Sequence, residues 1–165
     1  MTGIGGRAAA HALALAALLL AAGAPPSRAD FAEGLAALDA GDFETALQAW
    51  RPLAEAGDAE AQVALAGLYR DGLGLPADLV QAVRWYRRAA EQGDAVAQLN
   101  LGDLYARGAG LPRDLVQAHL WLSLAAAQGR RWAETRRQEI ATAMTVAELA
   151  EAKRLAEAWR PAAEP

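Results

Sequence analysis

Residues 57–92 read GDAEAQVALAGLYRDGLGLPADLVQAVRWYRRAAEQ, and residues 93–128 read GDAVAQLNLGDLYARGAGLPRDLVQAHLWLSLAAAQ. Aligned without a gap, the two stretches are identical at 21 of 36 positions. A fixed period of this length is typical of solenoids, in which each unit buries its apolar face only by stacking on its neighbours. The duplication therefore predicts a repeat architecture, and the remaining segments are interpreted as extensions of it.

Each copy carries the signals of two helices joined by a glycine-rich turn. Asp58 and Asp94 precede alanine-rich runs with helical spacing, so we expect them to be N-caps. Gly72-Leu73-Gly74-Leu75-Pro76 and its counterpart at 108–112 then interrupt the helix, since glycine permits a positive φ and proline disfavours helical geometry before it. The pattern predicts helix pairs near 58–71 and 78–91, and near 94–107 and 114–127.

The second helix of each copy begins at an Asp followed three residues later by Gln, at 78 and at 114. Trp85 and Trp121 occupy the same position of the two copies, so we interpret them as core residues rather than as ligand-stacking ones. The side expected to be buried comprises Leu79, Ala82, Trp85, Tyr86 and Ala89, and in the second copy Leu115, Ala118, Trp121, Leu122 and Ala125.

The flanking segments extend the same architecture. Residues 41–55 align with residues 77–91, so residues 30–56 are predicted to form a partial first unit, with Phe31–Asp39 as its shortened first helix. A helix over 130–143 and a last helix opened by the capping box at Thr145 are expected to cap the other end. The predicted organisation is thus a signal peptide at 1–29, one repeat domain at 30–160 with capping helices from 129, and a tail at 161–165.

The pattern resembles the Sel1-like repeat, a relative of the tetratricopeptide repeat. Leu122 departs from it where an aromatic residue is usual, and Ala66 stands where glycine is frequent. The residues that carry the resemblance in the first copy are Ala61, Leu65, Tyr69, Gly72, Gly74, Pro76, Asp78, Ala82, Trp85, Tyr86, Ala89, Ala90 and Gly93. The resemblance implies an all-α, right-handed solenoid of helix-turn-helix units that binds a short peptide or helix end of a partner protein on its concave face.

In folds of this kind the unburied side of each first helix faces the concavity. The positions concerned differ between the two copies while the packing positions repeat, which favours a shared core and a variable binding face. The alternative is that these residues are merely solvated. The candidate partner-binding residues are Glu60, Val63, Ala64, Gly67, Arg70, Asp71, Val96, Asn100, Asp103 and Arg107.

Residues 1–29 have the features of a secretory signal peptide. Arg7 is the only charge before an apolar run from Ala8 to Ala24, which only His11 interrupts. Ser27-Arg28-Ala29 places small residues at the third and first positions before a cut. The expected product is a periplasmic or secreted protein without membrane insertion. The alternative, an uncleaved anchor, is disfavoured because a spanning helix needs about 18 or more apolar residues.

The net charge and the absence of cysteine restrict the possible partners and the possible sources of stability. Loss of Arg7 and Arg28 with the signal peptide changes the net charge from −4 to −6, which argues against a nucleic-acid partner. The sequence contains no cysteine, so disulfides cannot form and stability has to come from helix packing. We expect an unidentified protein partner and a monomer or weak oligomer.

Side chains for catalysis are scarce after residue 29. His119 and Ser123 are one turn apart on a predicted helix and form a conceivable dyad, but no oxyanion-stabilising loop accompanies them. A single histidine cannot supply a zinc site. We therefore expect no enzyme activity, no cofactor and no metal. Two rival hypotheses remain: an enzyme or accessory subunit of cell-wall metabolism, and a structural oligomer that stacks on copies of itself.

Cleavage after Ala29 is predicted from the apolar run and the small residues before the cut. Intact-mass measurement of the protein recovered from the periplasm or the medium should give a chain that begins at Asp30. A full-length species that fractionates with membranes would contradict this prediction.

Overall fold

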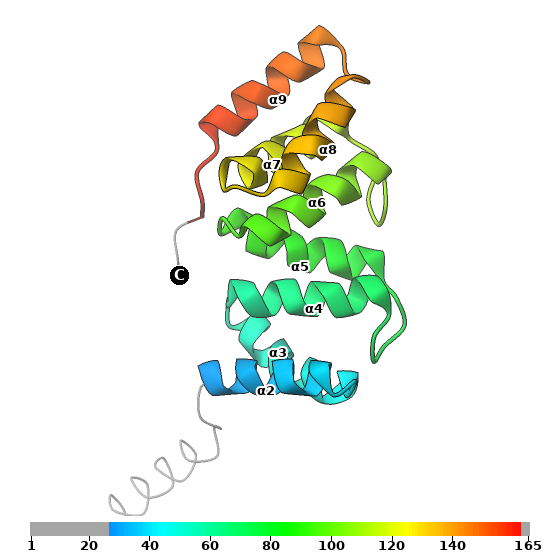
Figure 1. The fold of residues 1–165 in the computed structure, drawn as a ribbon, viewed down its shortest axis with the longest axis vertical. Coiled ribbons are helices and arrows are strands. Elements are labelled where there is room, and N and C mark those ends of the chain that lie inside the picture. The colour runs from blue at the N-terminus through cyan, green and yellow to red at the C-terminus, as the bar shows by residue number, and fades with distance from the viewer. Residues whose placement is uncertain (1–26, 163–165) are drawn as a thin grey trace, which may run out of the picture.

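The computed structural model describes residues 27–162, so most of the predicted signal peptide and the last three residues lie outside the described range. Within that range the chain forms eight helices and no strand. They stack in chain order from α2 at one end to α9 at the other (Figure 1). The helices are α2 Arg28–Asp39, α3 Phe43–Glu55, α4 Ala59–Asp71, α5 Leu79–Glu91, α6 Ala95–Arg107, α7 Leu115–Ala127, α8 Arg131–Ala141 and α9 Val146–Ala158.

The helices form successive antiparallel pairs, as the repeat predicts. In α3 to α7 each first turn is capped by an aspartate whose carboxylate accepts a backbone N–H two or three residues ahead, as Asp58 does from Ala61 and Asp94 from Ala97. Side-chain caps of this kind satisfy donors that a helix leaves unpaired at its N-terminus. The predicted all-α solenoid is therefore confirmed, and the helix limits of both repeats agree with the sequence to within one residue.

The core runs between the pairs as contiguous apolar clusters. Ala66, Tyr86, Leu101 and Trp121 belong to the central one, which spans both repeats. Two expected core residues of α5 differ from the prediction. Leu79 is 37% exposed and lies at the first residue of α5, where the neighbouring turn contacts its carbonyl group and its Cβ. Trp85 is only half-buried.

The second glycine of each turn makes the closest contact between units. Gly74 and Gly110 have φ values of +73° and +76°, a region that side chains strongly disfavour. A Cβ on Gly74 would lie 2.8 Å from Phe43 Cβ, and one on Gly110 would lie 2.6 Å from the carbonyl carbon of Leu79. Phe43 and Leu79 are 36 residues apart, as the glycines are. Each turn is thus pressed against the start of the second helix of the preceding unit.

The opposite edge of the stack is joined by glutamines. Gln62 and Gln98 are buried, and their side-chain amides donate to the carbonyls of Ala54 and Ala90 at 3.0 and 3.2 Å. Gln92 donates to Gln62 Oε1, and Gln128 to Gln98 Oε1, both at 2.9 Å. A buried amide without such partners would be destabilising. The network therefore links the end of each second helix to the next unit.

The last two helices cover the end of the second repeat. Alongside α8, α9 packs on α7, where Trp159 meets Trp121 edge-on with ring centroids 6.3 Å apart. His119 of α7 is only 3% exposed. Burial lowers the pKa of the imidazole, Arg137 and Lys153 lower it further, and Glu134 opposes them. The fold therefore holds His119 in its neutral form.

Substitution of Gly110 tests the turn contact. Gly110→Ala should lower the free energy of unfolding by about 2 kcal/mol or more, since backbone strain and overlap with Leu79 add together. Gly129 is the matched control, because its φ is also positive, at +84°, but a Cβ there meets nothing within 4 Å. Gly129→Ala should lower the free energy of unfolding only by the cost of backbone strain, about 1 kcal/mol. Urea unfolding of both variants measures the two losses. Equal losses would contradict the contact.

The neutral state of His119 predicts a dependence of stability on pH. Because the pKa is lower in the folded than in the unfolded chain, this contribution is complete above the unfolded value of 6.5 and is lost as the pH falls below it. His119→Val, which copies Val83 of the first repeat, should reduce the slope of unfolding free energy against pH between 7.5 and 5. Because His119 binds a single proton, the slopes of the wild-type and variant chains can differ by at most about 1.4 kcal/mol per pH unit. Identical slopes in urea unfolding would contradict this prediction.

Candidate functional site

A groove of about 320 Å³ lies across the first helices of three successive units, α2, α4 and α6. We call it the inner groove. Trp50 of α3 and Tyr86 of α5 reach it from behind these helices. Seven of the ten candidate binding residues line it: Val63, Ala64, Gly67, Arg70, Asp71, Val96 and Asn100. The structure thus brings most of the candidate set to one place, although the residues come from two different repeats.

One part of the inner groove is apolar. Leu35 and Leu38 of α2 face Val63 and Ala64 of α4 across it, and Leu35 is 43% exposed. Free space adjoins Gly67 in this groove, since a Cβ at this position would meet only the Tyr86 hydroxyl, at 4.0 Å. An apolar side chain of a partner could bury surface here without displacing any part of the fold.

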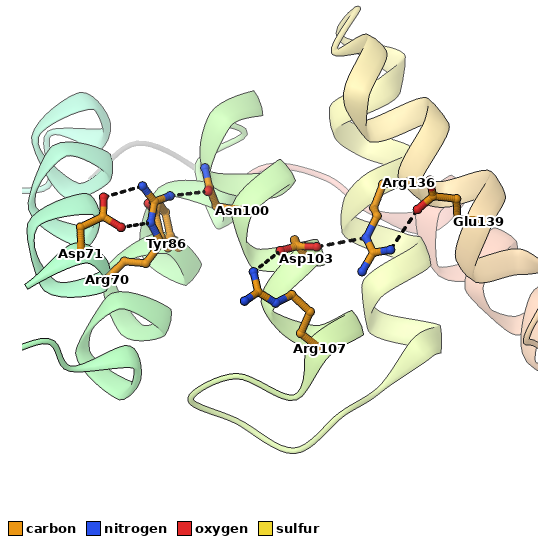
Figure 2. A network of polar contacts seen from close by, with 8 residues as sticks. All are labelled: Arg70, Asp71, Tyr86, Asn100, Asp103, Arg107, Arg136 and Glu139. Carbon is orange, nitrogen blue, oxygen red and sulfur yellow. Dashed lines mark hydrogen bonds and ion pairs between the residues drawn. The ribbon is translucent and has the colours of Figure 1, made fainter.

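The other part of the groove is a fixed polar network around Arg70 (Figure 2). Its guanidinium makes two 2.7 Å contacts with the Asp71 carboxylate. The Nη1 atom of Arg70 also donates to the Tyr86 hydroxyl at 3.1 Å and to Asn100 Oδ1 at 2.9 Å. Asn100 is itself fixed, because its Nδ2 donates to the Val96 carbonyl at 2.8 Å.

The electrostatics of this network follow from its hydrogen bonds. The hydrogen bonds to Asp71 hold the pKa of Arg70 above its usual value, and those to Arg70 hold the pKa of Asp71 below its usual value. Burial raises the pKa of Tyr86, so its hydroxyl stays neutral. Since the two charges neutralise each other, the network offers polar hydrogen-bonding groups but no net charge to a ligand.

A second polar group continues along α6 to α8 (Figure 2). Asp103, with a side chain 18% exposed, lies 3.1 Å from Arg107 Nη1 and 3.0 Å from Arg136 Nε. Arg136 also pairs with Glu139 at 2.9 Å. Asp103 and Arg107 therefore lie beyond the inner groove, and Asp103 also ties α6 to the first capping helix.

The tenth candidate, Glu60, lies apart from the groove and pairs with Arg28 of α2. Leu35, Leu38 and Tyr86 also line the groove, although they were not among the predicted binding residues. Nothing in the repeat pattern identifies the two leucines, because α2 belongs to the unit that lacks the glycine-rich turn. Tyr86 was assigned to the core on its spacing, and it is buried there while its hydroxyl reaches the groove.

The His119–Ser123 pair exists, with Ser123 Oγ 3.3 Å from His119 Nδ1. The imidazole is enclosed by the capping helices, however, which leaves a substrate no access to it. Over residues 27–162 no group of three or more potential metal ligands occurs. Within the same range no helix has the length and apolar character that a bilayer crossing needs.

Comparisons with known proteins agree with this architecture. A family model described as Sel1 repeat matches residues 59–94 and 95–129. A search of curated proteins gives no match. A protective antigen of uropathogenic Escherichia coli, described as displaying an SLR fold, superposes with a TM-score of 0.76 and 30% identity over 79% of this chain and 29% of that chain.

A Sel1 repeat protein from Oxalobacter formigenes superposes with a TM-score of 0.61 and 34% identity, covering 65% of this chain and 43% of that one. The chain thus spans less than half the length of either solved structure. The repeat spacing, the helix pairs and the family match agree. The protein contains two Sel1 repeats, residues 59–94 and 95–129, within an all-helical solenoid.

Proposed function

We propose that this protein is an adaptor whose inner groove binds a short peptide or a helix end of a partner protein. Sel1 repeats commonly mediate protein–protein interaction and are typically non-enzymatic scaffolds. The observation that carries the proposal is the composition of the groove, which places exposed apolar side chains beside a hydrogen-bonded polar network on three successive units. Binding sites for short segments combine these two features.

The chemistry of the groove defines the ligand. The apolar part between α2 and α4 fits one large apolar side chain, because Gly67 leaves room above the Tyr86 hydroxyl. The network around Arg70 and Asn100 fits uncharged polar groups, such as the backbone amides beside that side chain. A strongly charged segment gains little from a pair that is already neutralised. We therefore expect a short, mainly apolar ligand.

We also propose that the protein acts outside the cytoplasm, in the periplasm or the medium. The support is the charge, apolar run and small residues of segment 1–29. In the structure α2 begins at Arg28, so the proposed cut after Ala29 falls in its first turn. Arg28, which pairs with Glu60 and lies 5.3 Å from the Phe31 ring centroid, would be removed with the signal peptide.

Filling the groove tests the adaptor proposal. Gly67→Leu should weaken ligand binding at least tenfold, since the new side chain takes the space of the ligand's apolar group. Stability should hold or rise, because leucine favours a helix over glycine by up to about 1 kcal/mol. Gly67→Ala is the matched control and should retain binding. The probe is a peptide enriched on the wild-type chain from a displayed random library, with its affinity measured by fluorescence anisotropy.

Replacement of both His119 and Ser123 by Ala should leave binding of the same peptide unchanged. The adaptor proposal fails if no peptide is enriched. It also fails if Gly67→Leu binds the enriched peptide as tightly as Gly67→Ala does, since the ligand would then lie elsewhere on the molecule.

A further inference from the structure

The last described residues form a strap that runs back along the stack. We call Trp159–Ala162 the C-terminal strap; it leaves α9 and passes the turn between α5 and α6 (Figure 1). Pro161 and Trp159 each place an atom 3.7 Å from the position that a Cβ on Gly93 would occupy. The backbone N–H of Ala162 donates to the carbonyl of Glu91, the last residue of α5, at 2.7 Å. The strap is therefore a short extended segment bound at the junction of two units.

The binding of the strap has two components. Trp159 packs edge-on against Trp121 and joins the central apolar cluster, to which Leu124 also contributes. The N–H of Ala162 supplies the backbone hydrogen bond at the end of the helix. A half-buried aromatic side chain beside a repeat tryptophan, followed by an extended proline-containing stretch, is the chemistry that this junction accepts.

The repeat places an equivalent junction 36 residues earlier. Gly57 corresponds to Gly93, Glu55 to Glu91, and Gln62 to the buried Gln98. A groove of about 340 Å³ lies at this junction, with Gly57, Glu55, Gln62 and Arg88 among its lining residues. Ala162 also lines it, so this groove continues the path that the strap follows. We call it the outer groove.

The side chains of the two junctions differ at two of these positions, because Arg88 and Glu91 of the outer groove correspond to Leu124 and Ala127. Leu124, beside the bound strap, corresponds to Arg88 in the first repeat, and Arg88 lies over Trp85 with its guanidinium carbon 4.8 Å from the ring centroid. Trp85 therefore has a cation on its face where Trp121 has a second tryptophan. The carboxylates of Glu55 and Glu91 outnumber the single guanidinium of Arg88 in the outer groove. A basic residue in the ligand is favoured by this balance.

We propose that the outer groove binds an extended segment of a partner protein with the chemistry of the strap itself: an aromatic residue, a basic residue and a proline in succession. The aromatic ring packs beside Arg88 and Gly57, the basic residue faces Glu55 and Glu91, and a backbone N–H meets the carbonyl of Glu55. This surface lies on the edge of the turns between units and is separate from the inner groove. Binding at the outer groove does not depend on whether the inner groove binds a peptide.

The test uses the full chain and a synthetic peptide, Glu-Ala-Trp-Arg-Pro-Ala, which copies residues 157–162. The peptide should bind the wild-type protein at one site, and its Trp→Ala version should not. Glu55→Lys should weaken binding severalfold by repelling the peptide arginine. Arg88→Leu, which copies Leu124, should strengthen it severalfold. Both positions are exposed, so melting should change little, and Gly67→Leu should leave this binding unchanged.

A Trp159→Ala variant separates the outer groove from the strap's own junction. The proposal is overturned if the peptide binds this variant but not the wild-type chain, because the peptide would then only replace the strap. It is also overturned if the peptide binds neither protein, or if Glu55→Lys and Arg88→Leu leave its affinity unchanged. Concentration-dependent dimers that Trp159→Ala abolishes would assign the outer groove to a second copy of the chain and would likewise overturn the partner proposal.

Discussion

The stacking of units in this protein depends on a backbone contact that only glycine permits. Gly74 and Gly110 adopt positive φ and lie against the first residue of a second helix in the preceding unit, with no room for a Cβ. At the other edge Gln62 and Gln98 join each unit to the carbonyls that end the preceding helix. Each junction is thus fixed at both edges, and the apolar clusters between them fill the space that these contacts define.

Fixed junctions explain why a binding surface can vary without loss of the fold. The glycine and glutamine contacts of the junctions do not involve the side chains of α4 and α6 that line the inner groove, so the two repeats differ there while their packing residues coincide. One hydrogen bond between these side chains, from Arg70 to Asn100, also joins the two repeats. Asp103 has a second role, because it also pairs with Arg136 of the first capping helix. A substitution at Asp103 consequently affects the closure of the stack as well as its surface.

The carboxyl-terminal end shows how the stack is closed. The capping helices α8 and α9 cover the last repeat, and His119 is buried beneath them. Trp159 then fills the junction beside Trp121, which the strap completes through Ala162. The corresponding junction at Gly57 is lined by charged side chains instead. The end of the chain therefore occupies one of two related junctions, and this asymmetry motivates the proposed outer groove.

Much of the fold could be predicted from the sequence because its signals are local. Aspartate caps, glycine-rich turns and the 36-residue period set the limits of α4 to α7, and the family match agrees with them. The same period indicated which side chains of α4 and α6 share one face, and seven of these line the inner groove. The repeated Gln62 and Gln98 were visible as identities, but their hydrogen bonds depend on contacts between units.

The sequence by itself determined the helix pairs, their caps and the fold class, since each depends on residues within one turn or one repeat of each other. Only the tertiary structure decided that Leu35 and Leu38 complete the inner groove, that Leu79 is exposed, that His119 is buried and that the strap reaches Glu91. These features depend on which segments meet across the stack. Such contacts join residues of non-equivalent units, so the 36-residue period of the sequence does not predict them.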